Sequence, residues 1–114
     1  MTEHTSDIVI LGGGSGGFAA ALRAAELGKS VILIEKDKVG GTCLHRGCIP
    51  TKALLHAAEV AEHVKDAASV GVTATFSGID VAGVRAYREG IVAKKYKGLE
   101  GLVKARGITV VSGE

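Results

Sequence analysis

The sequence has no tryptophan and only one proline, two cysteines, two tyrosines and two phenylalanines among its 114 residues. So few aromatic rings exclude a core built on aromatic packing, whereas 17 glycines favour tight turns and close backbone contacts between aliphatic layers. With 46% hydrophobic and 23% charged residues, the composition is that of one small globular domain and excludes a disordered chain. The composition favours an α/β fold.

The chain also lacks a strong charge of either sign and a long apolar run. Its formal net charge of +2 is too small to indicate a nucleic-acid or membrane partner. The first residues are polar and acidic, where a secretory signal would have a basic start and an apolar run, and no later run is long enough to cross a membrane. The basic stretch at residues 85–106 mixes its charges with apolar residues, which favours a solvated helix face over a nucleic-acid patch. We expect a cytoplasmic protein with neither kind of partner.

The first 35 residues follow the order strand, glycine turn, helix, strand, acid. An apolar, β-branched run at residues 7–11 predicts a strand buried on both faces, and six residues of glycine and serine follow it directly. An alanine-rich helix is predicted at residues 18–27, with Gly28 as its C-terminal stop. A second buried strand is predicted at residues 30–34 and ends at Glu35.

This order places the glycine pattern in the context of a dinucleotide fingerprint. Gly12 permits a tight turn, Gly14 lets a pyrophosphate approach the backbone, and Gly17 lets the helix pack against the strand. Glu35 lies about twenty residues further on, where an acid that accepts from a ribose hydroxyl is expected. The pattern predicts dinucleotide binding rather than a purely structural turn, but it does not separate FAD from NAD because both contain adenosine diphosphate.

The rest of the chain supplies two helical stretches and one more strand. An amphipathic helix is predicted at residues 53–69, an extended excursion at 70–76, and a second helical stretch at 81–106 that is interrupted near Gly90 or Gly98. Residues 108–111 then form a third parallel strand. The expected architecture is half of a doubly wound sheet in one domain, with one sheet edge unpaired and marginal stability.

Both cysteines lie in the stretch Gly40-Gly-Thr-Cys-Leu-His-Arg-Gly-Cys-Ile-Pro-Thr-Lys52. They flank four residues at the predicted start of a helix, where the helix N-terminus and Lys52 would lower the thiol pKa of Cys48 and favour a thiolate. Cysteines five residues apart sit near the outer limit for bridging on a regular helix, so the first turn must be distorted. Gly47 can supply that freedom.

Three interpretations of the cysteine pair compete. A zinc site is disfavoured because the paired ligand clusters of structural zinc are missing, so no metal is expected. Two unrelated buried thiols would leave the surrounding glycines and the lysine unexplained. A redox-active pair on a flavin accounts for them best. A non-catalytic nucleotide-binding module, whose cysteines sense redox state or bind a metal, is the alternative from a different class of function.

The cysteine stretch, placed about twenty residues after an N-terminal glycine fingerprint, resembles that of the flavin-dependent pyridine nucleotide-disulfide oxidoreductases. The resemblance covers the whole chain and is closest to the members that oxidise dihydrolipoamide. Mercuric, mycothiol-disulfide and glutathione reductases are alternatives within the family. His45 and Arg46 depart from the Asn-Val pair that is common at these positions.

The resemblance implies a partial FAD-binding domain of Rossmann-like, doubly wound class in residues 1–114, with the NAD-binding and dimer-interface domains absent. It implies that Cys43 exchanges with substrate, that Cys48 faces the flavin, and that Lys52 lies beside the isoalloxazine. Electrons would pass from dihydrolipoamide on a lipoyl carrier domain through a Cys43–Cys48 disulfide and FAD to NAD. The implied FAD-binding residues are Gly12, Gly14, Ser15, Gly16, Gly17, Glu35, Lys36, Gly41, Thr42, Cys43, Cys48 and Lys52. The family also implies a homodimer and a part in cell redox homeostasis, and residues 1–114 alone are not expected to turn over.

Overall fold

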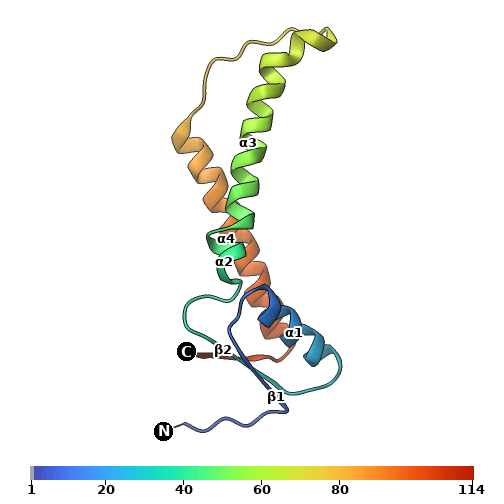
Figure 1. The fold of residues 1–114 in the computed structure, drawn as a ribbon, viewed down its shortest axis with the longest axis vertical. Coiled ribbons are helices and arrows are strands. Elements are labelled where there is room, and N and C mark those ends of the chain that lie inside the picture. Colours follow the sequence, from blue (N-terminus) through green and yellow to red (C-terminus); the bar gives the residue numbers. More distant parts are fainter. Residues whose placement is uncertain (1) are drawn as a thin grey trace.

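The computed structural model describes residues 2–114 and has an α/β architecture (Figure 1). The elements are, in order, β1 (Ile8–Leu11), α1 (Ser15–Glu26), β2 (Val31–Glu35), α2 (Gly41–His45), α3 (Cys48–Asp66), the 3₁₀ turn η1 (Ala67–Val70), α4 (Val81–Ala105) and β3 (Thr109–Ser112). The strands form one parallel sheet in the order β1-β2-β3. Ile8 is in register with Val31, and Ile32 with Thr109. The α/β prediction with parallel strands, as in the first half of a Rossmann-like sheet, is confirmed.

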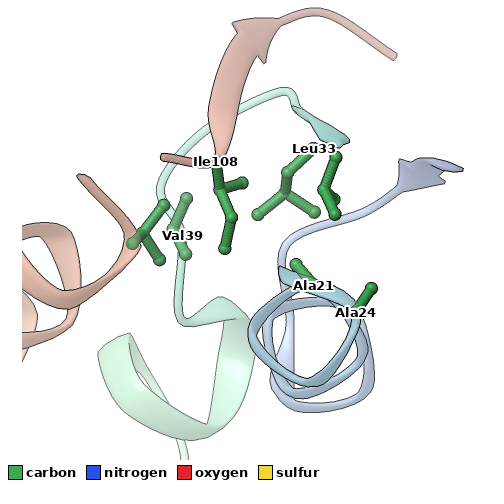
Figure 2. Packing of buried hydrophobic residues seen from close by; sticks show 7 residues of the cluster. Ala21, Ala24, Leu33, Val39 and Ile108 are labelled. Atoms are coloured by element: carbon green, nitrogen blue, oxygen red, sulfur yellow. The ribbon is translucent and has the colours of Figure 1, made fainter. Parts of the chain in front are cut away.

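The core lies between one face of the sheet and two helices. Ala21 and Ala24 of α1 pack against Leu33 of β2, which is fully buried, and the C-terminal end of α4 closes the other side (Figure 2). The complete buried cluster consists of Ala21, Ala24, Val31, Leu33, Val39, Val103 and Ile108. Alanines on α1 let the helix approach the sheet closely, in keeping with a core that has few aromatic residues.

The expectation that the first strand is buried on both faces is wrong. Val9 and Leu11 are 58% and 73% exposed, and they point to the face opposite Ile10 because side chains alternate along a strand. Within residues 2–114, β1 forms a sheet edge and helices cover only the face that carries Ile10 and Leu33. Such an apolar run is typical of a strand with two covered faces, whereas helices cover one face of this sheet within residues 2–114.

Helices α1 and α4 end in the same way. Gly28 follows α1 with φ +78°, and Gly107 follows α4 with φ +70°. After α4, the Gly107 amide donates to the Lys104 carbonyl at 3.0 Å and the Ile108 amide donates to the Val103 carbonyl at 3.2 Å. This is the Schellman arrangement, in which a left-handed glycine satisfies the last carbonyl groups of a helix. The prediction of Gly28 as a stop is confirmed.

Helices α3 and α4 run side by side away from the sheet and make the molecule elongated, 64 × 28 × 18 Å (Figure 1). The predicted interruption of the second helical stretch is wrong, because α4 is continuous for 25 residues through Gly90 and Gly98. An interior glycine costs a helix only about 1 kcal/mol, which packing against α3 and the core can offset. Residues 72–80, between η1 and α4, have neither helix nor strand structure. Among residues 2–114, no helix is both long and apolar enough to cross a membrane.

Candidate functional site

The glycine turn between β1 and α1 is packed too tightly for side chains at its base. Gly12 has φ +96°, and its amide donates to the Ile34 carbonyl at 2.8 Å. A Cβ atom on Gly17 would lie 1.8 Å from the Gly12 carbonyl oxygen. Because real Cβ atoms do not approach an oxygen this closely, α1 can sit in its place only with glycine at this position.

The space next to Gly14 and Gly16, at the N-terminus of α1, is open. A Cβ atom on Gly14 or Gly16 would meet no atom within 4 Å, and α1 has no side-chain cap at its N-terminus. The first backbone amides of α1, including that of Ser15, therefore have no capping partner and carry the positive end of the helix dipole. This arrangement fits an anion such as a pyrophosphate.

Glu35 closes the turn at the end of β2. Its carboxylate accepts hydrogen bonds from the Asp37 amide at 2.9 Å and the Gly13 amide at 2.6 Å. These two bonds, that from Asp37 first, hold the pKa of Glu35 below its ordinary value, so the side chain is ionised at neutral pH. Each carboxylate oxygen keeps a free lone pair that can accept from a ribose hydroxyl.

Glu35→Gln should weaken dinucleotide binding by about tenfold, because the amide nitrogen would face a backbone N–H that has lost its acceptor. In the unsubstituted protein the Glu35 carboxylate should accept from the dinucleotide at neutral pH. This ability should be lost only as the pH falls through the lowered pKa of Glu35. The measurement is FAD binding to the flavin-free full-length protein at several pH values. Glu26→Gln is the matched control, since Glu26 forms an exposed ion pair with Arg23 at 2.7 Å. Equal affinities for the two variants would contradict the assignment.

The two cysteines lie on separate helices. Cys43 is in the short helix α2, and Cys48 is the first residue of α3. The helical conformation is interrupted between them at Gly47, which has φ −126° and ψ −107°. A Cβ atom on Gly47 would lie 3.0 Å from the Thr42 carbonyl oxygen and 3.4 Å from the Cα atom of Cys43. The predicted distortion is confirmed, and it is a full break between two helices rather than an irregular first turn of one.

Both cysteines are free thiols, with Cys43 half-buried and Cys48 exposed. The sequence-based expectation of a lowered pKa at Cys48 is wrong for this reduced pair. Hydrogen bonding to the Cys43 side chain raises the pKa of the Cys48 thiol, and partial desolvation adds to the rise, while the charge of Lys52 opposes it more weakly. The lysine acts in the expected direction, but the neighbouring thiol outweighs it because it favours the protonated form.

The cysteine segment docks directly onto the glycine turn. The Gly40 amide donates to the Gly13 carbonyl at 2.8 Å. A Cβ atom on Gly41 would lie 2.7 Å from the Cα atom of Gly14, so the two backbones touch. A cavity of about 320 Å³ has both Ser15 and Cys43 in its lining. The glycine turn and the segment that carries Cys43 thus lie in direct contact.

The remaining predicted residues lie at the margin of this site. Thr42 is exposed on α2. Lys36 is exposed and forms an ion pair with Glu114 at 3.2 Å. Lys52 is exposed one helical turn after Cys48. No three or more His, Cys, Asp or Glu side chains between residues 2 and 114 are grouped so as to hold a metal ion.

Sequence reasoning missed two residues whose backbone groups hold the site together, Gly13 and Asp37. Gly13 supplies both a donor to Glu35 and an acceptor for Gly40, while Asp37 supplies the second amide to Glu35. The fingerprint treats position 13 as variable. The signal available in the sequence was the run of three glycines at 12–14 together with the pair at 40–41, because adjacent glycines at two places are consistent with two backbones in contact.

The fold and site define an α/β protein with a Rossmann-like first half and a dithiol segment packed against its glycine turn. The family model described as pyridine nucleotide-disulphide oxidoreductase matches residues 6–114. The chain belongs to this family.

Its relatives include proteins named dihydrolipoyl dehydrogenase. The chain is 45% identical to the protein of that name from Bacillus subtilis over 112 residues, which cover 98% of the chain and 23% of the relative. The identity to the Haemophilus influenzae protein is also 45% over 112 residues, covering 97% of the chain and 23% of the relative. Dihydrolipoyl dehydrogenase 2 of Haloarcula marismortui is 43% identical over 108 residues, which cover 95% of the chain and 23% of the relative. The chain thus spans about a quarter of the length of these relatives.

Proposed function

We propose that the protein oxidises dihydrolipoamide to lipoamide, with FAD as bound cofactor and NAD as final electron acceptor, as the dihydrolipoyl dehydrogenase component of 2-oxoacid dehydrogenase complexes. The observation that carries the proposal is the contact between the cysteine segment and the glycine turn at Gly40–Gly13 and Gly41–Gly14. This contact supports the proposal because it brings the segment that carries the cysteines against the turn that would hold a dinucleotide. The names of the relatives favour dihydrolipoamide as the substrate.

The residues present fit FAD. The uncapped N-terminus of α1 and the open space over Gly14 and Gly16 would accept its pyrophosphate, and the ionised Glu35 would accept from its ribose. Lys36, Gly41, Thr42 and Lys52 would line the remainder of its path. When bound, FAD supplies a two-electron acceptor between the dithiol and NAD.

The two cysteines carry out the exchange with substrate. In the oxidised pair, one thiolate of dihydrolipoamide attacks the Sγ atom of Cys43 and releases Cys48 as a thiolate. The second substrate thiolate then attacks the sulfur bound to Cys43, so that the cyclic disulfide of lipoamide leaves and Cys43 is reduced. One disulfide forms and one breaks, and two electrons pass from the substrate dithiol to the cysteine pair, while the two protons that the substrate thiols lose on forming thiolates balance those that the cysteine thiolates can take up. The half-buried Cys43 and the exposed Cys48 give the two sulfurs unequal environments.

The test uses the full-length protein, purified and assayed for bound flavin and for turnover. Oxidation of dihydrolipoamide with NAD should exceed reduction of glutathione disulfide, mycothiol disulfide or mercuric ion with NADH or NADPH by about 10³-fold or more in kcat/KM, because an enzyme discriminates between substrates through the transition state that it stabilises. NADP in place of NAD tests the pyridine nucleotide. Preference for one of the other substrates would replace dihydrolipoamide within the same family. Protein that purifies without flavin and binds none would overturn the flavin mechanism and favour a redox-sensing module.

Several parts of the proposal concern regions outside these residues. Residues 1–114 would be part of an FAD-binding domain, and NAD binding and homodimerisation would require other domains. The proposed partner is a lipoyl carrier domain, and the proposal includes a cytoplasmic location and a role in cell redox homeostasis. The 114 residues alone are not expected to turn over.

A further inference from the structure

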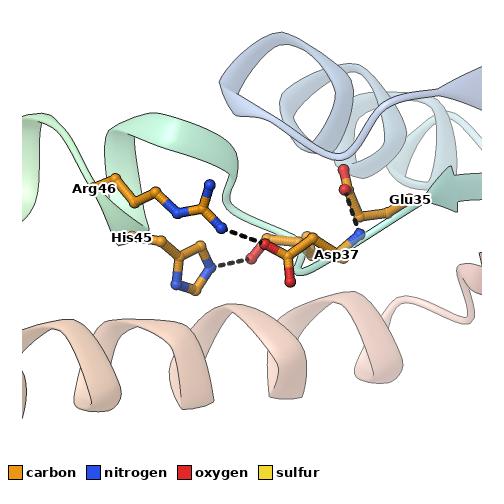
Figure 3. Close-up of polar contacts among 5 residues, drawn as sticks. Glu35, Asp37, His45 and Arg46 are labelled. Carbon is orange, nitrogen blue, oxygen red and sulfur yellow. Dashed lines mark hydrogen bonds and ion pairs between the residues drawn. The ribbon is translucent and has the colours of Figure 1, made fainter. Parts of the chain in front are cut away.

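His45, the last residue of α2, has no part in the proposed thiol chemistry, yet its side chain is tied to the segment before α2. Its ring Nε2 atom lies 3.0 Å from the Val39 carbonyl oxygen (Figure 3). Because a carbonyl oxygen only accepts, the ring nitrogen is the donor and carries a proton. A Cβ atom on Gly40 would lie 3.1 Å from this nitrogen, so the ring packs directly on the turn that leads into α2.

The same ring contacts α4. The His45 and Tyr96 rings meet edge to face, with centroids 4.8 Å apart and an interplanar angle of 74°. This arrangement is a favourable geometry for two rings. Both side chains are half-buried. His45 therefore connects three parts of the chain: the turn at Val39 and Gly40, the helix α2, and the middle of α4.

Helix α2 depends on such contacts because it has only five residues, too few to be stable by itself. Cys43 lies in this helix, two residues before His45, whereas Cys48 begins the 19-residue helix α3. Gly47 interrupts the helical backbone between α2, which carries Cys43, and α3, which begins with Cys48. The position of Cys43 relative to Cys48 is thus set by how firmly α2 is held.

We propose that His45 is a positioning residue of the cysteine pair. It holds α2 against the turn and α4, and so keeps the Sγ atom of Cys43 within bonding reach of the Sγ atom of Cys48. The effect is a higher effective concentration of one thiol at the other, which favours the disulfide. This inference rests on the proposed function, because it assumes that the two cysteines form a redox disulfide.

Arg46 is the matched control. It is the next residue along the chain, and it also contacts the segment after β2, through an ion pair with Asp37 at 2.8 Å (Figure 3). Its side chain is 76% exposed and that of Asp37 is 53% exposed. Exposed ion pairs contribute little, about 0–1 kcal/mol. Loss of Arg46 should therefore leave α2 in place, whereas loss of His45 should not.

The experiment measures the equilibrium of the pair in the FAD-loaded full-length protein with glutathione. One glutathione disulfide and the two thiols give the Cys43–Cys48 disulfide and two glutathione molecules, and alkylation followed by mass spectrometry reports the ratio. His45→Ala should lower the equilibrium constant for disulfide formation about tenfold, which is about 30 mV toward easier reduction. Arg46→Ala should change it by less than about twofold. His45→Gln retains a side-chain donor and should recover part of the loss, and it also provides the measurement if His45→Ala loses FAD.

The outcomes separate the two hypotheses. If wild-type protein forms the disulfide and the His45 variants match Arg46→Ala, the positioning role is overturned while the redox pair stands. If wild-type protein forms no Cys43–Cys48 disulfide at any glutathione ratio, the proposed function fails and the positioning role with it. A fall in melting temperature without a change in the equilibrium constant would show a structural role only, and would also overturn the inference.

Discussion

Serine in place of either Cys43 or Cys48 is expected to lower the kcat of dithiol oxidation in the full-length protein by at least ~10³-fold, because each sulfur is a reacting atom in the exchange. The two variants should nevertheless differ. Cys43→Ser should retain a thiolate facing the flavin and show a long-wavelength absorbance band, which Cys48→Ser should lack. Equal spectra would contradict the assignment of the two sulfurs.

The Cys43→Ser variant also tests the electrostatics of the reduced dithiol. In the parent protein the pKa of Cys48 lies above its ordinary value, chiefly through hydrogen bonding to Cys43, so its thiolate forms only at higher pH. Cys43→Ser removes the neighbouring sulfur and should move the pH profile of Cys48 alkylation by iodoacetamide to lower pH. Lys52→Met in that background should move the profile back toward higher pH, because the charge of Lys52 lowers this pKa. An unchanged profile in Cys43→Ser would show that the cysteine side chains do not interact.

Alanine at Gly17 should destabilise the protein by about 3 kcal/mol and abolish FAD retention. The new Cβ atom would lie 1.8 Å from the Gly12 carbonyl oxygen and 2.9 Å from its carbon, both in the backbone, so either the turn or α1 must move. Urea unfolding and flavin content of the full-length protein measure the two effects.

Gly98→Ala is the control for adding a methyl group to a helical glycine. No atom lies within 4 Å of the Cβ position at Gly98, which is inside α4. This variant should be more stable by about 0.5–1 kcal/mol and should keep its FAD, since alanine is the better helix former. Equal destabilisation of the two variants would mean that the contact with Gly12 is not the cause.

The elements that the sequence predicted well are those with local signals. The two strands at residues 8–11 and 31–35 have a local signal, namely a β-branched run that is followed by glycine or ends at an acid. Gly28 ends α1 because glycine can adopt a positive φ. Gly12 and Gly17 lie in contact, as their places in the fingerprint require. Local composition was a poor guide where packing decides, as in α4, whose continuity through Gly90 and Gly98 depends on α3 and the core.

In the site, the distortion of the backbone between the cysteines was predicted from the sequence, whereas the pKa shift of Cys48 and the contacts of His45 were not. The spacing of Cys43 and Cys48 requires a distorted backbone, and a break at Gly47 provides it. The sign of the pKa shift at Cys48 was not predictable from the helix start and Lys52 alone, because the larger effect comes from a through-space neighbour on another helix. The contacts of His45 with Val39 and Tyr96 depend on the tertiary arrangement of three segments and have no local pattern.

The tip of the α3–α4 hairpin also has a practical use. Residues 72–75 are exposed and outside any helix or strand. They precede Phe76, and the Lys65 Nζ atom lies over the Phe76 ring, 4.9 Å from its centroid. An exposed segment without ladder hydrogen bonds tolerates insertion well. A fluorophore or affinity tag placed there would lie at the end of the molecule opposite the sheet and separated from the cysteine pair by the length of α3 (Figure 1). The hairpin thus offers an attachment point for following the protein in larger assemblies while its thiols remain free to react.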